Sequence, residues 1–383
     1  MELKEYRFDE VTDNFDKKRI PLSSAQRKKR QGKYRYYGAQ GVIDHIDDFI
    51  FDGTYLLIAE DGENLKSKKQ NIAQVVDGQF WVNNHAHIVQ GNELCDTRYL
   101  CYLLNSMDLS GYVTGSAQPK LSQANLNAVT LLLPTITVQK KIVHYLYMFD
   151  KKITVNQQIN DNLQQQAAAI FRSWFVDCIP FGSTVPDEWK NVTLEDITAL
   201  ISRGISPKYA DDTDQTVINQ KCIRNHIIDL SFARSHRPKV INNKWLQFGD
   251  LLINSTGDGT LGRAAQVWFQ PHNLTVDSHV TIVRPAAENM IFYIGLWGTQ
   301  HEKEIESLHT GSTGQTELPR DRVKAIELLL PDKETLERFN ALIAPMAAAI
   351  VSNQEENNRL ASIRDALLPK LMSGKIDVSS IRL

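Results

Sequence analysis

Two long stretches of the chain carry the same helical pattern with the same polar interruption. At alternating spacings of four and three residues, the first stretch is apolar from Ile142 to Trp174 except at Asn156 and Asn160. A hydrophobic repeat of about 3.5 residues is the seam of a coiled coil. Moved on by 197 residues (353 − 156), the same spacing gives a second seam in which asparagines again fall on asparagines. Its positions are Phe339, Ile343, Met346, Ile350, Asn353, Asn357, Leu360, Arg364, Leu367 and Leu371.

An asparagine buried in such a seam costs stability and fixes the register of the pairing. Each seam runs about 50 Å at 1.5 Å per residue, and antiparallel pairing would bring the two asparagine layers together. We expect Asn156, Asn160, Asn353 and Asn357 to be the register residues of a paired helical strut. The alternative is that they face solvent or another protein's helix. Pro345, inside the second seam, should kink that helix or mark its start.

The same offset aligns segments outside the helices. The segment "SAQPKLSQANLNAVTLLLP" ends at Pro134, and "STGQTELPRDRVKAIELLLP" ends at Pro331. Likewise "DGTYLLIAEDGENL" (52–65) aligns with "GDLLINSTGDGTLG" (249–262). Solenoid repeats recur every few tens of residues, so a period this long indicates domain duplication instead.

The segments outside the seams predict a mixture of strands and helices. Short runs rich in β-branched and aromatic residues alternate with turn residues, and helical patterns such as "TRYLCYLLNSM" (97–107) and "MIFYIGLWGTQHEKEIESL" (290–308) lie between them. We expect an α+β fold in which two similar domains are separated by two long antiparallel coiled-coil helices, with a pseudo-two-fold internal repeat. The predicted boundaries are 1–135 and 181–332 for the domains, and 136–180 and 333–383 for the helical spacers.

Composition narrows the class of protein. No apolar run approaches the roughly 20 residues of a membrane span, and the charged N-terminus lacks the apolar core of a signal peptide. The four cysteines form no CxxC pair, which favours a reducing, cytoplasmic setting over disulfides or zinc. The net charge of −2 does not by itself indicate a nucleic-acid binder, but "KKRIPLSSAQRKKRQGKYRYYG" (17–38) is densely basic. A solvated surface is the alternative interpretation of that run.

Two motifs suggest enzyme chemistry and are better explained otherwise. "GDGTLG" (257–262) fits a dinucleotide-binding pattern, but "RAAQVWF" after it reads as a strand, so a phosphate would lack a helix N-terminus. We expect a hairpin or a DNA-facing loop there. "PDEWK" (186–190) resembles a nuclease fragment, yet a nuclease gathers its acidic residues from separate strands, and Trp189 reads as a core anchor. The sequence also lacks the Asn-Pro-Pro-aromatic motif of adenine methyltransferases.

Together these motifs resemble a known family. The doubled Gly-Ser loop before "LLLP", the segment "VPDEWKNVTLEDI" (185–197), the helical "NxxxNxxL" pattern and "LPKLMSGKI" near the C-terminus are similar to the specificity subunit of type I restriction–modification systems. The resemblance covers essentially the whole chain. It implies two target-recognition domains, each followed by a helical spacer, and a bipartite DNA target with one half-site per domain. The first domain departs from the pattern, because it lacks the tryptophan-containing start that the second has.

The resemblance also implies partners. It implies double-stranded DNA, two methylation subunits that use S-adenosylmethionine and two restriction subunits that use ATP and Mg²⁺, in a defence system. The specificity subunit itself has no catalytic site and binds none of these cofactors or a metal. Two rival interpretations are a self-contained methyltransferase or nuclease, and a structural clamp between two protein-binding heads. The expected docking surface for the methylation subunits is the outward face of the helices, with Lys140, Lys141, Lys151, Lys152 and Gln164 to Gln166.

DNA-binding candidates follow from side-chain chemistry. Lysine and arginine bind phosphates, while arginine suits guanine edges and asparagine or glutamine suits adenine edges. His85 and His279 occupy matching places in the two halves, and each is either a DNA-facing histidine or a core or hydrogen-bonding histidine. The candidates in the first domain are Arg27, Lys28, Lys29, Arg30, Lys33, Tyr34, Arg35, Lys66, Lys68, Lys69, His85, Gln118 and Lys120. Those in the second are Arg203, Lys208, Lys221, Arg224, Asn225, Arg263, His279, Gln315 and Arg320.

Overall fold

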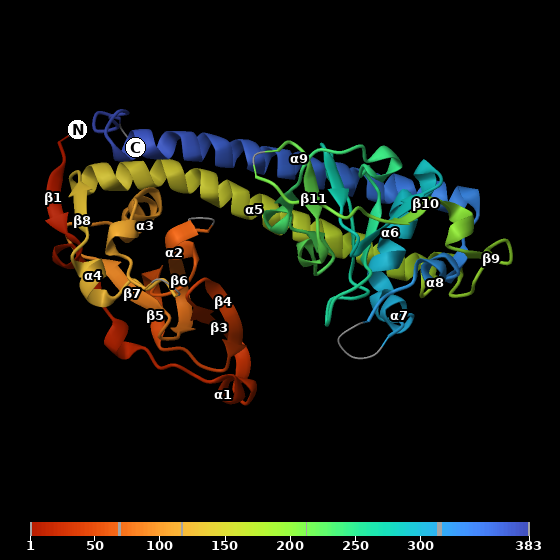
Figure 1. Ribbon diagram of the computed structural model, residues 1–383, viewed down its shortest axis with the longest axis horizontal. Coiled ribbons are helices and arrows are strands. Elements are labelled where there is room, and N and C mark those ends of the chain that lie inside the picture. Colours follow the sequence, from red (N-terminus) through yellow and green to blue (C-terminus); the bar gives the residue numbers. More distant parts are fainter. Residues whose placement is uncertain (1, 68–69, 116–117, 212, 312–315, 382–383) are drawn as a thin grey trace. The chain divides into compact units, whose positions relative to one another are not determined.

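The chain packs as two compact units. The computed structural model describes residues 2–67, 70–115, 118–211, 213–311 and 316–381 (Figure 1). Unit 1 comprises Met1–Ile153 with Arg359–Leu383, and unit 2 comprises Thr154–Asn358. This division cuts both long helices, so each unit contains part of α5 and part of α9. The predicted boundaries instead assign each helix to a separate spacer, and they stay a prediction. Among the residues described, no helix has both the length and the apolar character that crossing a membrane requires.

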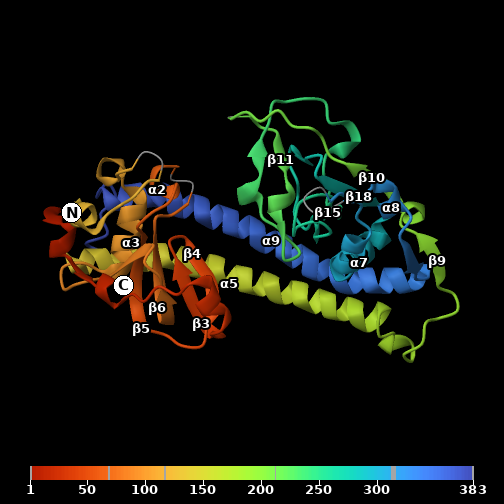
Figure 2. The ribbon, with the colours of Figure 1, turned by 60° about the horizontal axis from the view of Figure 1, so that its bottom comes forward.

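Two long helices dominate the secondary structure, as the seams predict. Helix α5 spans Ile136–Phe175 and helix α9 spans Lys333–Met372, each of 40 residues, and each ribbon is continuous in Figures 1 and 2. The prediction that Pro345 marks the start of the second helix is wrong, because α9 begins at Lys333. Proline removes one intrahelical hydrogen bond. Both Pro345 and Ala341, whose carbonyl loses that bond, are exposed, so water can satisfy the carbonyl.

The asparagines of the two seams contact each other within unit 2. The Asn156 amide donates to the Asn357 side-chain oxygen at 2.9 Å, and the Asn353 amide donates to the Asn160 side-chain oxygen at 2.8 Å. Asn156 is fully buried and Asn160 nearly so. The contacts cross over, the earlier residue of one helix meeting the later residue of the other, so the helices run antiparallel here. Asn156 also donates to the Glu356 carboxylate at 2.7 Å.

Unit 1 is built on a six-stranded sheet in the order β2-β7-β5-β6-β3-β4. Its neighbours pair antiparallel except β3 and β6, which are parallel. The strands are β2 (Thr12–Asn14), β3 (Gln31–Gly38), β4 (Gly41–Ile46), β5 (Phe51–Ala59), β6 (Ala73–Val82) and β7 (Ala86–Gly91). A separate pair, β1 (Lys4–Arg7) and β8 (Thr130–Leu133), leads into α5. The short helices are α1 (Ser24–Lys28), α2 (Asn64–Ser67), α3 (Thr97–Ser106) and α4 (Gln123–Asn127).

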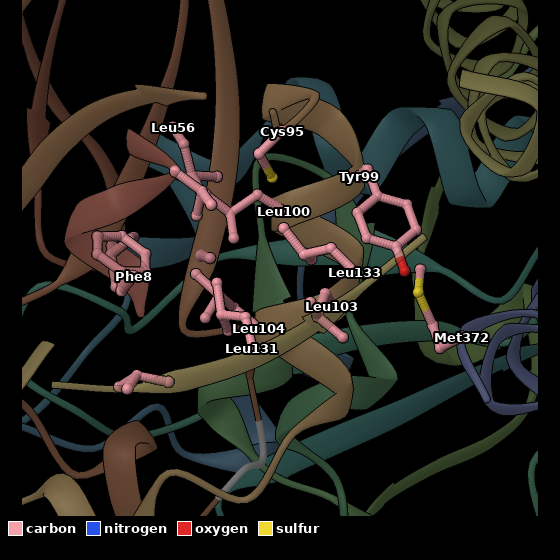
Figure 3. Close-up of a cluster of buried hydrophobic side chains, with 14 of the residues drawn as sticks. Phe8, Leu56, Cys95, Tyr99, Leu100, Leu103, Leu104, Leu131, Leu133 and Met372 are labelled. Carbon is pink, nitrogen blue, oxygen red and sulfur yellow. The ribbon is translucent and has the colours of Figure 1, made fainter. Parts of the chain in front are cut away.

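The core of unit 1 joins this sheet to both long helices. Alternation along β5 buries Leu56 and Ile58 against the amphipathic α3, which contributes Tyr99, Leu100 and Leu104 (Figure 3). The start of α5 adds apolar side chains, and the end of α9 adds Leu371 and Met372. In Figure 3 the Met372 side chain points toward Tyr99. Side chains from the end of α9 onward therefore complete a core whose other buried residues lie between Phe8 and Leu146.

Unit 2 has shorter strands in several sheets. A four-stranded sheet has the order β10-β18-β15-β16 and a three-stranded sheet the order β14-β11-β17 (Figure 2). The strands are β9 (Lys190–Thr193), β10 (Thr198–Arg203), β11 (Thr216–Ile218), β12 (Ile223–Arg224), β13 (Ile227–Ile228), β14 (Arg234–Ser235), β15 (Leu251–Asn254), β16 (Ala264–Gln266), β17 (Leu274–Val276), β18 (Val280–Pro285) and β19 (Glu327–Leu330). The helices, besides its parts of α5 and α9, are α6 (Ile291–Gln300), α7 (Glu302–Ser307) and α8 (Arg320–Lys324).

The core of unit 2 likewise takes side chains from both long helices. Ala167 and Phe171 of α5 and Phe339 and Ile343 of α9 lie in one buried cluster with α6 and the four-stranded sheet. Trp189 is also buried and donates its indole N–H to the Asp332 carboxylate at 3.2 Å. Its ring packs on Phe175, so it anchors the start of β9 as the sequence predicts.

The glycine-rich segment 257–262 connects two antiparallel strands, β15 and β16. Gly257, Gly259 and Gly262 all have positive φ, which side chains with a Cβ rarely adopt. A strand follows the segment where a dinucleotide-binding motif would have a helix. The prediction of a hairpin at this place is confirmed.

We expect the substitution Asn156→Ala to lower the free energy of unfolding by about 1–3 kcal/mol, because it leaves the Asn357 side chain without its hydrogen-bond partner. The double variant Asn156→Leu with Asn357→Leu should recover part of this loss, since the paired amides are removed together while Glu356 still loses the hydrogen bond from Asn156. Urea unfolding of the single and double variants measures the coupling. Gln165→Ala, an exposed position on the same helix, is the control. Equal losses for Asn156→Ala and Gln165→Ala would contradict the expectation.

Candidate nucleic-acid interface

In unit 1 a histidine and a loop meet where strand β5 ends. The His85 carbonyl accepts a hydrogen bond from the Glu60 N–H at 2.9 Å, and the His85 ring nitrogen Nδ1 lies 2.7 Å from the Asp61 carboxylate. Lys120 pairs with Asp61 as an isolated bridge and exchanges two backbone hydrogen bonds of 2.8 Å with Thr114. We call Asp61, His85, Thr114 and Lys120 the histidine edge of unit 1.

Unit 2 has the same backbone arrangement. The His279 carbonyl accepts from the Ser255 N–H at 2.8 Å, and its Nδ1 lies 2.7 Å from the Thr256 hydroxyl. Glu317 pairs with Thr256 as a bridge and exchanges backbone hydrogen bonds of 2.8 and 2.9 Å with Thr310. We call Thr256, His279, Thr310 and Glu317 the histidine edge of unit 2. Both histidines are exposed and hydrogen-bonded, so neither is a core histidine, and contact with DNA stays a prediction.

Several predicted candidates of unit 1 lie at its histidine edge. Lys120 is 55% exposed and lies 3.3 Å from the Glu60 carboxylate. Lys66, on α2, donates to the Gly115 carbonyl at 2.9 Å, and Gln118 is exposed in the same loop. The structure therefore brings Lys66, His85, Gln118 and Lys120 together. Three further candidates, Lys68, Lys69 and Gln315, lie outside the described residues.

The basic run of unit 1 lies on α1 and β3 and contacts other parts of the sheet. Arg27 pairs with Asp44 at 2.9 Å, and Arg30 pairs with Asp47 at 2.9 Å while its guanidinium lies over the Trp81 ring. The Arg35 guanidinium donates to the backbone carbonyl of Asp77. These arginines therefore organise the sheet. The other candidates of the run are Lys28, Lys29 and Lys33, which are exposed, and Tyr34, which packs on Phe49.

The candidates of unit 2 are spread over four places. Arg203 of β10 belongs to its histidine edge, because it forms an ion pair with Glu317 and donates to the Leu318 carbonyl at 2.9 Å. Arg320 follows two residues later and is exposed. Arg263 donates to the Gly259 carbonyl inside the glycine-rich hairpin. The exposed Lys208 precedes β11, and the exposed Lys221, Arg224 and Asn225 lie in or beside the short β12–β13 hairpin.

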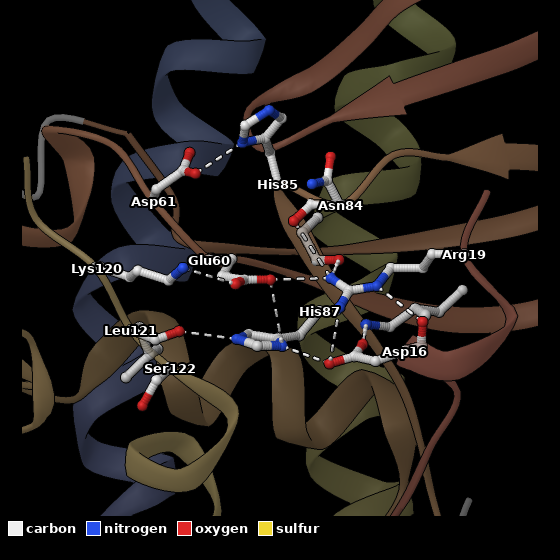
Figure 4. A network of polar contacts seen from close by, with 12 residues as sticks. Asp16, Arg19, Glu60, Asp61, Asn84, His85, His87, Lys120, Leu121 and Ser122 are labelled. Carbon is white, nitrogen blue, oxygen red and sulfur yellow. Dashed lines mark hydrogen bonds and ion pairs between the residues drawn. The ribbon is translucent and has the colours of Figure 1, made fainter. Parts of the chain in front are cut away.

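A buried polar network lies directly behind the histidine edge of unit 1 (Figure 4). His87, only 1% exposed, has Nδ1 2.6 Å from the Asp16 carboxylate and Nε2 2.8 Å from the Leu121 carbonyl oxygen. Arg19 lies 3.0 Å from the Glu60 carboxylate and 3.5 Å from that of Asp16. The network therefore ties the N-terminal segment to the carbonyl of the residue after Lys120.

The hydrogen bonds and ion pairs of this network shift two pKa values in opposite directions. Burial alone would lower the pKa of His87, but its hydrogen bonds to Asp16 and to the Leu121 carbonyl, with the attraction of Asp16 and Glu60, raise it above 6.5. Burial alone would raise the pKa of Asp16, yet hydrogen bonds from His87 and from the Ile88 N–H lower it below its usual value. Both shifts favour the charged forms, an imidazolium at His87 and a carboxylate at Asp16.

Sequence reasoning missed this network. Asp16, Arg19, Glu60 and His87 were not among the candidates, because the partners are 71 residues apart in the case of Asp16 and His87. The sequence contained one signal. "HAHIV" (85–89) has two histidines two residues apart at the start of a strand, so their side chains lie on the same face. In unit 2 the residue at the place of His87 is Thr281, whose hydroxyl lies 2.6 Å from the Ser255 hydroxyl.

The side chains at the histidine edges suit hydrogen bonding and charge contacts better than nucleophilic chemistry. Burial raises the pKa of the Cys95 and Cys101 thiols to about 12 and that of Cys222 to about 11, so these cysteines are thiols at neutral pH. The imidazoles, carboxylates and hydroxyls of the two edges and the Lys120 ammonium, each exposed or partly exposed, offer both donors and acceptors. Such a set of side chains can read the donor and acceptor pattern of base edges or bind phosphates.

We expect Asp16→Asn to lower the free energy of unfolding by about 3 kcal/mol at pH 6, because it leaves the buried His87 cation without its carboxylate. The loss should be smaller at pH 9. The pKa of His87 is raised on folding, so the proton on its ring stabilises the fold fully below pH 6.5 and progressively less as the pH rises through the raised value. Urea unfolding at the two pH values tests this, with Asp9→Asn, an exposed carboxylate, as the control that should change little at either. An equal loss at both pH values would contradict the assignment of charge.

Comparisons with known proteins point to one family. Residues 2–165 match the family model described as the type I restriction modification DNA specificity domain. The chain is 25% identical over 361 residues to a putative type I restriction enzyme specificity subunit of Haemophilus influenzae, covering 88% of this chain and 85% of that one. It is 26% identical over 314 residues to the MjaIX specificity subunit of Methanocaldococcus jannaschii, covering 74% and 70%.

A solved structure shares the fold. The crystal structure of the type I restriction–modification S subunit from M. genitalium aligns with a TM-score of 0.59 and 13% identity, over 97% of this chain and 96% of that one. At this identity the likeness concerns the fold alone. The family model matches residues 2–165, and both relatives are type I restriction enzyme specificity subunits, so the chain is similar to the specificity subunits of type I restriction–modification systems.

Proposed function

We propose that the chain is the sequence-specific DNA-binding subunit of a type I restriction–modification complex, without a catalytic site of its own. The observation that supports this most directly is the pair of histidine edges, which present exposed hydrogen-bonding side chains from the same backbone arrangement in both units. The similarity to specificity subunits suggests a target for these edges, since specificity subunits select the DNA on which the complex acts. The chain would act in the cytoplasm.

The DNA target is bipartite, and each unit reads one half-site. This rests on duplication, which the bounds of the elements support. Helix α9, strand β19 and helix α8 each begin and end 197 residues after α5, β8 and α4. The backbone bonds around Glu60, His85 and Leu121 also recur around Ser255, His279 and Leu318. The two units are in this view two target-recognition domains with different side chains on equivalent backbones, so they read different bases.

The paired helices set the gap between the half-sites. Crossed hydrogen bonds between Asn156 and Asn357 and between Asn160 and Asn353 would each be lost if one helix slid by a turn along the other. A slipped pair would leave buried amides unsatisfied, which costs about 1–3 kcal/mol for each group. These four asparagines therefore define the register, and the register defines the length over which DNA is recognised.

The partners are two methylation subunits, which use S-adenosylmethionine, and two restriction subunits, which use ATP and Mg²⁺. The outer surface of α5 supports a protein partner, because it exposes large apolar side chains. Tyr147 is 39% exposed, Met148 53%, Val155 39% and Ile159 43%. Apolar side chains clustered on one helix are typical of a surface that another protein covers. Lys151 and Lys152 are exposed on the same helix.

Methylome sequencing of cells that carry this chain with its methylation subunits tests the proposal. It should show one methylated motif made of two short specific sequences separated by a fixed gap. Methyl transfer by the purified chain alone would support the self-contained enzyme instead. Absence of any new methylated motif, with all subunits present and soluble, would count against DNA recognition.

Insertion of one heptad into each helix should lengthen the gap. Seven residues between Ile153 and Thr154, with seven matching residues between Asn358 and Arg359, add about 10 Å of helix. This corresponds to about three base pairs at 3.4 Å each. The methylated motif should keep both half-sites and gain about three base pairs between them. A seven-residue insertion into α5 alone is the control and should abolish methylation, because the part of α5 in unit 1 then no longer matches the part of α9 that completes the same core. An unchanged gap in the double insertion would disprove the role of the helices.

The double substitution Lys28→Ala with Lys29→Ala should weaken binding of all DNA sequences alike. If both lysines contact phosphates, the slope of log affinity against log salt should fall by about two. The measurement is a salt titration of DNA binding by the complex with the methylation subunits. Lys190→Ala on β9 is the matched control, and it should leave the slope unchanged. A loss of affinity confined to one sequence would instead assign the two lysines to base reading.

A further inference from the structure

The two histidine edges differ in the side chain that contacts one equivalent backbone carbonyl oxygen: a histidine in unit 1 and an arginine in unit 2. In unit 1 the carbonyl oxygen of Leu121, directly after Lys120, lies 2.8 Å from Nε2 of His87. In unit 2 the carbonyl oxygen of Leu318, directly after Glu317, accepts from the Arg203 guanidinium at 2.9 Å. The two leucines are equivalent, because their N–H groups donate to the carbonyls of Glu60 and Ser255, each at 2.8 Å.

The hydrogen bond from His87 requires a particular protonation state. A carbonyl oxygen can only accept, so Nε2 must carry a proton to bind Leu121. Nδ1 lies 2.6 Å from the Asp16 carboxylate, whose other oxygen accepts from the Ile88 N–H at 2.8 Å. Both ring nitrogens therefore donate, which only the imidazolium can do. When His87 loses one proton, one ring nitrogen carries a lone pair and faces an acceptor oxygen, so that hydrogen bond is lost.

The carboxylate decides which contact survives deprotonation. Asp16 is charged and is the nearer partner of the ring, so the single proton of a neutral His87 stays on Nδ1. Nε2 then faces the Leu121 carbonyl with a lone pair, and that hydrogen bond is lost. The charged groups around the ring come from every neighbouring element: Asp16 and Arg19 from the N-terminal segment, Glu60 from the end of β5 and Lys120 from the loop.

Arg203 offers no such transition. Its guanidinium stays protonated at any pH at which the protein folds. At the place of His87 unit 2 has Thr281, paired with Ser255, and both side chains are fully buried and uncharged. Unit 2 therefore holds the same carbonyl without a titrating group.

We propose that His87 and Arg203 are the positioning residues of the two histidine edges, and that protonation of His87 makes target recognition by unit 1 alone dependent on pH. Neither side chain touches DNA in this assignment. The effect on DNA recognition rests on the proposed function. The effect on the loop that contains Lys120 and Leu121 rests on the geometry alone. As the pH rises through the raised pKa of His87, the edge of unit 1 loosens while that of unit 2 stays fixed.

Hydrogen exchange of the full chain without DNA tests the loop part. The reporters are the N–H groups of Lys120 and Leu121 in unit 1 and of Glu317 and Leu318 in unit 2, each hydrogen-bonded in the backbone. After correction for the intrinsic pH dependence of exchange, protection at Lys120 and Leu121 should fall about tenfold between pH 6 and pH 9, as expected for loss of one hydrogen bond to a charged group. Protection at Glu317 and Leu318 should not change. Equal behaviour of the two edges, or no change at either, would overturn the proposal.

Variants separate positioning from general destabilisation. His87→Gln keeps a donor near the place of Nε2 but cannot titrate, so it should retain protection of the loop and abolish its pH dependence. His87→Ala should lose protection at all pH values. Arg203→Gln should weaken protection at Glu317 and Leu318 without introducing a pH dependence. A His87→Gln chain that keeps the pH response of the unchanged protein would assign the response to another group, such as His85. If His87→Ala does not fold, the comparison of the two edges in the unchanged chain still decides.

DNA binding provides the second readout. For the complex with methylation subunits, on a duplex that carries its methylated motif, affinity should fall about tenfold more between pH 6 and pH 9 for the unchanged chain than for His87→Gln. If the complex bound no DNA sequence specifically at any pH, the proposed function would fail while the exchange result stood. If exchange responded and binding did not, the loop would move without serving recognition, and the pH-dependent part of the proposal would be wrong.

Discussion

The packing of α5 against α9 is the interaction on which both units depend. In unit 1, Leu371 and Met372 from the end of α9 lie in the core with side chains from the N-terminal strands. In unit 2, Ala167 and Phe171 from α5 lie in the core with Phe339 from α9. Each core is thus completed by a helix that the other half of the sequence supplies. Burying a large apolar side chain contributes about 1.5–3 kcal/mol, so misplacing either helix would remove several such contributions from both cores.

This dependence explains why the seam tolerates buried amides. An apolar seam would pair more strongly but would also pair nearly as well after sliding by one heptad. Such a slide would keep the helices together and pull Leu371 or Phe171 out of the cores. With Asn156 facing Asn357 and Asn160 facing Asn353, sliding leaves polar groups buried without partners. The seam with asparagines is less stable than an apolar seam would be, but it favours one register of the two helices and so one arrangement of the chain.

The sequence predicted what depends on periodicity and missed what depends on long-range contacts. Both 40-residue helices follow from the spacing of their apolar residues, and the matching places of His85 and His279 follow from the repeat. The buried network of Asp16, His87 and Leu121 could not be found this way, because a histidine in a strand has the same sequence pattern whether its side chain faces water or a carboxylate. The basic run was visible as charge, but its pairing with acidic residues of β4 depends on the sheet register. Burial and pairing are properties of the assembled sheet, which local pattern does not contain.

Pairing also decides how strongly this chain can bind DNA by charge alone. The run from Lys17 to Gly38 carries many cations, but Arg27 and Arg30 lie against carboxylates, and Arg35 donates to a backbone carbonyl. A cation already paired with a carboxylate releases fewer counterions from DNA, so its contribution to non-specific affinity is small. The net charge of −2 points the same way. Under the proposed function, a recognition subunit built like this would contribute selectivity through hydrogen bonds at its edges, and partner subunits that also contact the duplex would supply most of the affinity. Weak intrinsic affinity would then be an advantage, because a chain that bound every phosphate backbone tightly would leave the two edges little influence over where the complex stops.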